Sequence, residues 1–403
     1  MAKTIAVIGA LDTKGKDFAF VTDEIVGRGH RALLIDTSVV GKPPFHAHIP
    51  SSEVARAGGV GLRALRAQAN KALAMEVMTR GIAKVVKRLF DRGKIDGVLS
   101  MGGTAGTAIG TSAMRALPIG FPKVMVSTVA SGDTSAYVGT RDIVMIPSIV
   151  DVAGVNRISA PIYANAVGAI VGMAETRAPS LAHKPLLAAS MFGNTTPIVN
   201  RCVEAMARRG YETLVFHATG TGGKTMESLV DEGFFDGVLD ITTTEWADEI
   251  AGGVFTAGPT RGDAAARRGI PQIIVPGCVD MVNFFAPETV PVKYKNRRFY
   301  RWNPNITLMR TTPEENAQIG RILAEKANAA VGPVAIFLPL RGVSMLDAPG
   351  KEFWWPEANQ ALFDAIKQNV KPDISVVEMD NNINDDAFAD AVAGKLLELL
   401  VVS

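Results

Sequence analysis

The sequence has almost no cysteine and almost no net charge. Only Cys202 and Cys278 occur in 403 residues, so disulfide bonds are not a framework for the fold and a reducing compartment is expected. With 42 basic and 40 acidic residues, the formal charge of +2 gives no overall attraction to polyanions. We therefore expect no nucleic acid and no membrane among its partners.

Long apolar runs are also missing. No uninterrupted apolar stretch reaches the roughly 18 residues that a membrane span requires. The apolar opening of the chain runs into Asp12, Lys14 and Lys16, without the small-residue cleavage site of a signal peptide. The opening is therefore interpreted as a first strand, and the sequence predicts a soluble, cytoplasmic protein.

The glycine pattern of dinucleotide-binding folds is absent from the first strand-loop-helix unit. Leu11 and Thr13 stand where the GxGxxG pattern needs glycine. Since those glycines form the tight turn and let the backbone approach a pyrophosphate, a standard dinucleotide site is not predicted here.

What the sequence does contain is an alternation of apolar runs and helical patterns, typical of parallel α/β proteins. A chain of 403 residues is too long for one small core, so two domains are expected. Residues 177–185 carry two prolines and no periodicity, which marks a crossing between domains. The predicted fold class is α/β: two Rossmann-like domains, 1–180 and 181–403, each a mostly parallel sheet flanked by helices.

A glycine-rich turn in residues 97–111 (GVLSMGGTAGTAIGT) is the most informative stretch. A short apolar strand ends there and a helix of small residues follows. Glycines leave backbone N–H groups unobstructed, and a helix N-terminus adds partial positive charge. Gly102, Gly103, Thr104 and Thr107 are therefore predicted to bind a phosphate or carboxylate. The alternative is a tight turn that binds nothing.

Other turns are expected at the same carboxyl edge of the first sheet, where open α/β sheets bind ligands. They follow the first, second and fourth expected strands. The candidate residues in these turns are Asp12, Thr13, Lys14, Gly15, Asp36, Ser131, Gly132 and Thr134.

In the second half, residues 218–225 (ATGTGGKT) loosely fit the P-loop pattern, in which backbone and lysine hold phosphates. A generic anion-binding turn and a purely structural turn are the alternatives. His217 and Asp280 are candidates for acid and base at strand ends. The residues expected to hold a second ligand are His217, Gly220, Gly222, Gly223, Lys224, Thr225, Arg341 and Ser344.

Acidic residues that follow expected strands are candidates for magnesium binding or acid/base work, although solvated loop carboxylates are the default. They are Asp12, Asp36, Asp133, Asp240, Glu245, Asp280 and Asp347. No set of metal ligands is defined by spacing.

Residues 293–302 (KYKNRRFYRW) alternate cations with aromatics. A flap over an anionic small molecule, or a subunit contact, is favoured there over single-stranded nucleic acid.

Four motifs in order resemble the nucleotide-binding half of the tomato mosaic virus resistance protein and its bacterial relatives. They are residues 8–15 (IGALDTKG), 102–104 (GGT), 217–223 (HATGTGG) and 276–280 (PGCVD), and the resemblance spans essentially the whole chain. It implies two Rossmann-like domains, ATP with magnesium in a cleft, and self-association into dimers. In the plant protein a barrel domain related to phosphoenolpyruvate hydrolases follows, so a separately encoded barrel protein is an expected partner.

Three hypotheses for function follow. In the first, the chain binds ATP and magnesium, either as a binding protein or as an ATP-dependent enzyme for a small acidic metabolite in the cleft between the two domains. Lys14 would neutralise charge, and Asp12 or Asp36 would meet ribose or magnesium. In the second, it is a nucleotide-independent enzyme of sugar-acid metabolism that uses His217 and Asp280. In the third, it is a binding module for the barrel protein.

Overall fold

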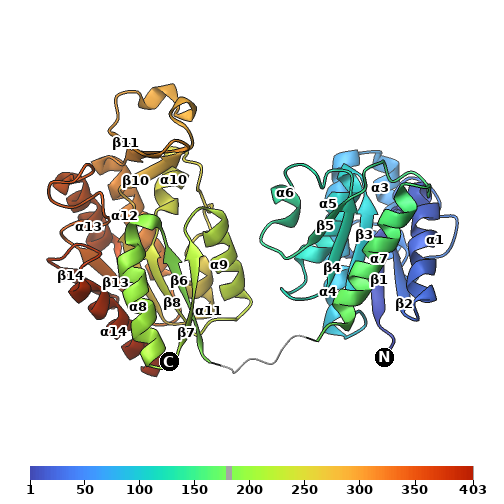
Figure 1. Ribbon diagram of the computed structural model, residues 1–403, viewed down its shortest axis with the longest axis horizontal. Helices are drawn as coiled ribbons and strands as arrows, with labels where there is room; N and C mark the ends of the chain where they lie inside the picture. Colours follow the sequence, from blue (N-terminus) through green and yellow to red (C-terminus); the bar gives the residue numbers. More distant parts are fainter. Residues whose placement is uncertain (178–183, 403) are drawn as a thin grey trace. The chain divides into compact units, whose positions relative to one another are not determined.

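The computed structural model describes residues 1–177 and 184–402. The chain divides into two compact units, Met1–Ser180 and Leu181–Ser403, called here the first and second unit. Each has its own sheet, flanked by helices, so the predicted fold class is confirmed (Figure 1). Most of the predicted crossing segment, 177–185, lies outside the described residues.

The first unit contains a five-stranded parallel sheet in the order β2-β1-β3-β4-β5. Because all pairings are parallel, the carboxyl ends of the strands share one edge. Its strands are β1 (Thr4–Gly9), β2 (Arg31–Asp36), β3 (Gly97–Gly102), β4 (Lys123–Ser127) and β5 (Val144–Pro147).

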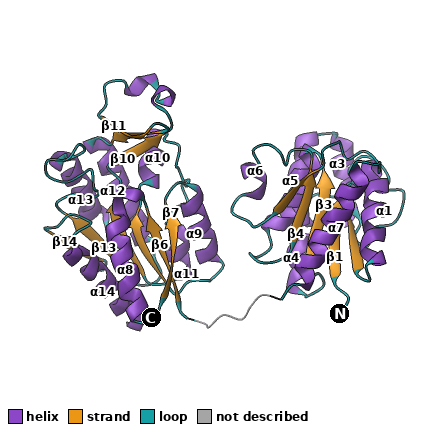
Figure 2. Ribbon diagram, viewed as in Figure 1, coloured by secondary structure: helices purple, strands orange, loops and turns teal. Residues whose placement is uncertain are grey.

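Helices cover both faces of this sheet (Figure 2). α1 and α7 pack over one apolar cluster, and α2, α4 and α5 pack over the other. This two-sided burial explains why β1 and β3 read as continuous apolar runs. The helices are α1 (Leu11–Gly27), α2 (Ser51–Ala57), α3 (Leu62–Gln68), α4 (Lys71–Asp91), α5 (Thr104–Arg115), α6 (Ser135–Val138) and α7 (Ser159–Glu175).

Two helix boundaries differ from the prediction. The pattern after β1 predicts a helix over 17–27, whereas α1 begins at Leu11 with one turn and a kink at Lys14. The pattern over 64–91 predicts a helix broken near Arg80 and Gly81, but the break falls after left-handed Ala69, and α4 then runs unbroken through Gly81. A Cβ at Gly81 would lie 2.0 Å from the Val54 carbonyl oxygen, so this glycine permits close packing of α2 on α4 rather than breaking α4.

The second unit contains a six-stranded parallel sheet in the order β14-β13-β9-β8-β6-β7. In chain order this is 2-1-3-4-5-6, which extends the 2-1-3-4-5 order of the first unit. The architecture is therefore repeated, as predicted. The strands are β6 (Leu186–Met191), β7 (Glu212–His217), β8 (Gly237–Thr242), β9 (Gln272–Gly277), β13 (Val334–Pro339) and β14 (Ser375–Met379).

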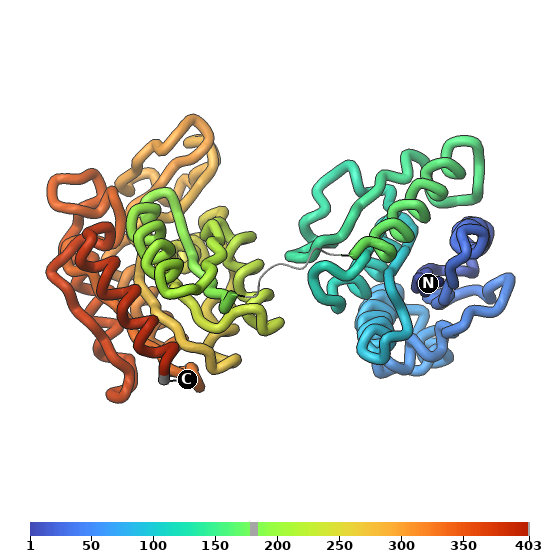
Figure 3. Tube along the Cα trace, turned by 60° about the horizontal axis from the view of Figure 1, so that its bottom comes forward, coloured from blue at the N-terminus to red at the C-terminus, as the bar shows by residue number. Residues whose placement is uncertain are grey.

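Helices again lie on both faces, and α8 near the start of this unit packs along α14 at its end (Figure 3). The α-helices are α8 (Thr196–Arg208), α9 (Thr221–Asp231), α10 (Glu245–Ala251), α11 (Asp263–Arg268), α12 (Pro313–Asn328), α13 (Pro356–Asn369) and α14 (Asp386–Val402). Single 3₁₀ turns occur at η1 (Gly193–Thr195), η2 (Pro287–Thr289) and η3 (Val292–Tyr294). Among the described residues of either unit, no helix is both long and apolar enough to cross a bilayer.

A small antiparallel sheet, in the order β10-β12-β11, is added to the second unit and was not predicted. Its strands are β10 (Met281–Phe284), β11 (Phe299–Asn303) and β12 (Ile306–Arg310). The apolar run at 306–310 predicts a strand, which is present as β12, but it pairs antiparallel with β10 and β11 rather than joining the parallel sheet.

Candidate functional site

The carboxyl edge of the first sheet brings the predicted turns together. In the order β2-β1-β3, the connection after β1 leads to one side of the sheet and the connection after β3 leads to the other side. Open α/β sheets bind ligands at such a switch in strand order. Residues 10–15 follow β1, and residues 103–107 follow β3. Both predicted turns therefore flank this switch point.

The N-terminus of α5 is open at this edge. Gly103 is the N-cap of this 12-residue helix and contributes no capping side chain. The N–H groups of Thr104, Ala105 and Gly106 have no hydrogen-bond acceptor among the described residues, and Thr104 and Ala105 are exposed. Unpaired N–H groups and the helix dipole together favour an anion at this position.

The two glycines of this turn have different roles. A Cβ at Gly102 would lie 2.9 Å from the Gly106 Cα, so this glycine lets β3 and α5 approach closely. A Cβ at Gly103 would meet only the Thr128 hydroxyl oxygen, at 3.7 Å. Gly103 therefore leaves space above the open N–H groups, and the Thr128 hydroxyl lies beside that space.

Thr107 is positioned under this turn, not in it. Its side chain is fully buried, and its hydroxyl lies 2.6 Å from the Ser127 hydroxyl. Ser127 also accepts the N–H of Val129, which fixes the start of the turn after β4. The predicted direct contact between Thr107 and a ligand is therefore wrong, and the residue instead joins β4 to α5.

A hollow of about 420 Å³ lies beside Thr128, at the carboxyl ends of β4 and β5. Of the residues predicted after β4, Ser131 lines it, whereas Gly132 and Thr134 do not. Hydroxyl groups contribute much of its lining, and one carboxylate, Asp151, stands at it. The lining residues are Ser127, Thr128, Ser131, Pro147, Ser148, Ile149, Val150 and Asp151.

Residues 11–15 form a single helical turn that ends in a kink at Lys14, whose φ of −124° and ψ of 22° are not helical, so the expected turn precedes the continuous part of α1. The Asp12 carboxylate accepts the N–H of Gly41 at 2.8 Å and so holds the loop after β2. The Lys14 ammonium donates to the Val152 carbonyl, next to the hollow. Since an ammonium carries three donors, Lys14 keeps two for an anion, while Asp12 is already engaged.

Asp36, Thr13 and Gly15 offer less to a ligand than predicted. Asp36 is 2% exposed, and one of its carboxylate oxygens accepts the N–H groups of Leu11 and Ser38. It therefore orients the start of α1 and is not placed to meet ribose or magnesium. Gly15 is buried, and the Thr13 hydroxyl is exposed on α1.

In the second unit, residues 218–225 do not form a phosphate-binding loop. α9 already begins at Thr221, and the Glu245 carboxylate accepts the N–H groups of Gly220 at 2.8 Å and Gly223 at 3.1 Å. A carboxylate of the protein therefore occupies the place that a bound anion would take. The P-loop interpretation and the generic anion-binding turn are both corrected by this contact.

Arg261 holds Glu245 in that position. Its fully buried guanidinium donates to Glu245 at 2.6 Å, to both oxygens of Asp240 at 2.6 and 2.7 Å, and to Glu227 at 3.3 Å. Burial by itself would lower the pKa of Arg261, but the surrounding carboxylates outweigh it and raise that pKa. Asp240 and Glu245 are thus partners of an arginine and not magnesium ligands.

The proposed acid and base are not brought together. His217 is exposed at the end of β7, where its ring stacks on Phe192 with centroids 5.3 Å apart. Asp280 is fully buried after β9 and accepts the Ser344 hydroxyl at 2.8 Å. Burial, with Asp347 nearby, raises the pKa of Asp280 to about 7. Since β6 and β8 lie between β7 and β9, about 14 Å separates these strands.

The other residues predicted to hold a second ligand are dispersed. Lys224 is exposed on α9, and the Thr225 hydroxyl donates to the helix backbone at 2.8 Å. Gly222 lies within the first turn of α9. Arg341 forms an exposed ion pair with Asp380, with contacts of 2.7 and 2.8 Å.

The junction equivalent to β3–α5 in the second unit is closed. It lies between β8 and α10, where Thr244 is the N-cap and Glu245 the first helical residue. Both are buried, and the Thr244 hydroxyl donates to the Met281 carbonyl of β10. The added antiparallel sheet therefore covers this junction, whereas its counterpart at Gly103 is open.

Comparison with known proteins identifies the family. Residues 3–179 match the N-terminal domain of the Uncharacterised protein family (UPF0261), and residues 184–400 match its C-terminal domain. The chain belongs to this family. A UPF0261 protein of Clostridium tetani is 50% identical over 402 residues, covering 99% of this chain and 100% of that protein.

The resemblance to the tomato protein is confirmed as well. The ToMV resistance protein Tm-1(GCR237) of Solanum lycopersicum is 41% identical over 360 residues, which are 87% of this chain and 48% of that protein. Among solved structures, UDP-N-acetylglucosamine 2-epimerase from Rickettsia bellii aligns at 11% identity with a TM-score of 0.21, over 100% of this chain and 96% of that one. That structural likeness is too low to bear on function.

Sequence reasoning missed several residues that define the sites in this UPF0261 chain. Arg261 lies in a loop without periodicity, so nothing local indicated that it pairs with three carboxylates. Ile149 and Asp151 follow the short edge strand β5, and no turn motif marked them. Among the described residues, no cluster of three or more His, Cys, Asp or Glu side chains is arranged to hold a metal ion by itself.

Proposed function

We propose that this UPF0261 protein binds a nucleoside triphosphate, ATP with magnesium, at the carboxyl edge of the first sheet. The observation that supports the proposal is the open N-terminus of α5, whose N–H groups at Thr104, Ala105 and Gly106 are unpaired among the described residues. At the equivalent junction of the second unit, buried threonines and the added sheet leave no such opening.

The groups around this N-terminus suit a polyphosphate. Thr128 stands beside Gly103 and supplies a hydroxyl, and Ser131 lines the adjoining hollow. Lys14 lies on the other side of the switch point, bonded to Val152, and has donors left for negative charge. Backbone N–H groups, hydroxyls and one ammonium are the donor set that phosphate oxygens accept.

Magnesium fits here as part of a nucleotide complex. Mg²⁺ keeps several waters and is held by one or two carboxylates together with substrate phosphates. Asp151, exposed at the hollow, is the carboxylate in place for that role. The bound ion would supply charge neutralisation between phosphates. The side chains of this unit would orient the nucleotide.

Titration calorimetry of the whole chain with ATP and MgCl₂ tests this function. Gly103→Val adds a side chain above the open N–H groups, so it should weaken binding by at least about tenfold, the equivalent of about 1.4 kcal/mol. Gly61→Val is the matched control, because Gly61 is also a helix N-cap, its φ is −69°, and a Cβ there would meet nothing within 4 Å. Equal affinity in the Gly103→Val and wild-type proteins would contradict the assignment.

The sugar-acid hypothesis is not favoured, because His217 and Asp280 lie at separated strands and Asp280 is buried. We also propose that the chain self-associates into a dimer, as the resemblance to the tomato protein implies, and that a separately encoded barrel protein is a partner. For the partner, the supporting fact is that the match to the tomato protein spans 48% of that longer protein. Light scattering of the pure chain and affinity purification from the native host test these two inferences.

A further inference from the structure

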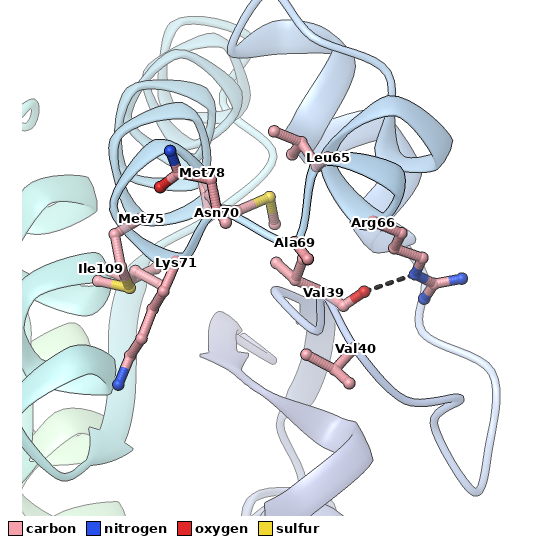
Figure 4. Close-up of a pocket in the computed structure, with 11 residues that line it drawn as sticks. Val39, Val40, Leu65, Arg66, Ala69, Asn70, Lys71, Met75, Met78 and Ile109 are labelled. Atoms are coloured by element: carbon pink, nitrogen blue, oxygen red, sulfur yellow. Dashed lines mark hydrogen bonds between the residues drawn. The ribbon is translucent and has the colours of Figure 1, made fainter.

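The first unit has an aliphatic cavity on the face covered by α4 and α5. Its volume is about 540 Å³, within the range of small-molecule sites (Figure 4). Five parts of the chain contribute to it: the loop after β2, α3, the α3–α4 turn, α4 and α5. The residues that line it are Val39, Val40, Leu65, Arg66, Ala69, Asn70, Lys71, Ala74, Met75, Met78 and Ile109.

The floor of the cavity is part of the protein core. Met78 is 0% exposed, Leu65 is 2% exposed and Ile109 is 8% exposed. All three belong to the apolar cluster between α4, α5 and the sheet. A cavity with such a floor is not a loose gap between loops, because its base cannot shift without disturbing the core.

The walls are held by hydrogen bonds that do not involve a ligand. The Arg66 guanidinium donates to the carbonyls of Val39 and Gly41, so it fixes the loop after β2 (Figure 4). On the α3–α4 side, Ala69 is left-handed at φ 47°, and Asn70 caps α4 by accepting a backbone N–H at 3.1 Å. The cavity is therefore pre-formed, which reduces the ordering required on binding.

The charges at the cavity have one sign. No acidic residue lines it, and the Lys71 ammonium has no carboxylate partner among the described residues. Figure 4 shows Lys71 leaving α4 beside Met75 and Ile109, across from Val39 and Val40. Arg66, the other cation, is engaged with backbone carbonyls, so Lys71 is left to pair with a bound anion.

We propose that this cavity binds a small organic acid with an aliphatic body, whose carboxylate pairs with Lys71. Valine, leucine, isoleucine, methionine and alanine side chains would take an alkyl group out of water, which is favourable in proportion to the apolar area covered. The site uses Ile109 on the flank of α5 and not the N-terminus of that helix. It therefore does not depend on the proposed nucleotide site.

Calorimetry with octanoate and octan-1-ol on the whole chain separates the apolar and charged contributions. Octanoate should bind. Lys71→Gln should weaken octanoate by about threefold, as for a solvent-accessible ion pair, and leave octan-1-ol unchanged. The matched control is Lys84→Gln, an exposed lysine farther along α4 that does not line this cavity.

Two further variants test the cavity itself. Ala74→Phe fills it and should weaken both probes by at least about tenfold. Val40→Asp changes a residue that is 88% exposed, so folding is preserved, and it should weaken octanoate more than octan-1-ol by repulsion. Gly103→Val should leave octanoate binding intact, so loss of nucleotide binding and loss of acid binding are distinguishable.

Three outcomes would overturn the proposal. They are failure of octanoate to bind, octanoate binding that is insensitive to both Ala74→Phe and Val40→Asp, and a Lys71→Gln effect no larger than that of Lys84→Gln. A change of oligomeric state in Val40→Asp, with no octanoate binding to the wild type, would instead assign the face to a second copy of the chain.

Discussion

At the scale of single residues, Ile149 has a backbone conformation that suits glycine. Its φ is +64°, and the N–H of Val150 bonds back to the Ser148 carbonyl at 2.7 Å, which makes a strained γ-turn. A β-branched residue with positive φ is rare. Ile149 is nevertheless 74% exposed at the rim of the hollow, so burial does not explain it. Strain of this kind is found at ligand-binding sites.

Replacing Ile149 by glycine should therefore stabilise the protein and weaken the proposed nucleotide binding. Relief of the strain should raise the free energy of unfolding by about 1 kcal/mol, measured by urea denaturation. Val150→Gly is the control and should lower the free energy of unfolding. The φ of Val150 is not positive, so glycine there only adds flexibility to the unfolded chain. A loss of stability in Ile149→Gly would show that the turn is not strained.

The Asp280 carboxyl gives a pH-dependent stability. Burial and Asp347 raise its pKa to about 7, above its value near 4 in the unfolded chain. Because the folded state retains the proton, this contribution is complete below about pH 4 and is lost as the pH rises to about 7. Asp280→Asn keeps an acceptor for Ser344 but cannot ionise.

The free energy of unfolding of the wild type relative to Asp280→Asn should thus fall by on the order of 1 kcal/mol per pH unit between pH 5 and 7. Urea denaturation of both proteins at pH 5, 6, 7 and 8 measures this difference. A difference that stays constant across the series would mean that Asp280 ionises normally. Asp373→Asn, at an exposed carboxyl in the turn before β14, is the control.

At the scale of elements, the junction of β3 and α5 contains two glycines with different roles. Gly102 permits close packing of the strand on the helix, and Gly103 leaves space at the proposed site. Gly102→Ala places a Cβ 2.9 Å from the Gly106 Cα, so the strand end and the helix must separate. We expect a loss of about 1–3 kcal/mol in the free energy of unfolding, as for overpacking. Gly103→Ala meets nothing closer than 3.7 Å and should have little effect. Equal losses in the two variants would contradict this division of roles.

At the scale of the whole molecule, the two units have separate apolar clusters and sheets. Calorimetric unfolding should therefore show two transitions. Arg261→Met leaves the buried carboxylates of Asp240 and Glu245 without a counter-charge and should destabilise the second unit by about 3–5 kcal/mol. Mg-ATP should raise the midpoint temperature of only one transition, the one that Arg261→Met leaves unchanged. One transition that moves under both changes would contradict this independence.

Much of the fold was accessible from the sequence because it depends on local patterns. Apolar runs of strand length, each followed by a helical period, predict parallel α/β units, and the GGT turn at 102–104 predicts a strand-to-helix junction. The small sheet around β10 was missed because short strands flanked by 3₁₀ turns lack a clear period.

The sequence by itself determined the α/β alternation, the two-unit organisation and the glycine turn at Gly103, since each rests on residues close together in the chain. Only the tertiary structure decided which of the two glycine-rich turns is open to a bound anion. Residues 218–225 look as suitable as 102–107, yet Glu245 at the start of α10 fills the first of these, held there by Arg261 from a loop. Strand order, which no local pattern specifies, also set His217 apart from Asp280 and brought Thr128 beside Gly103.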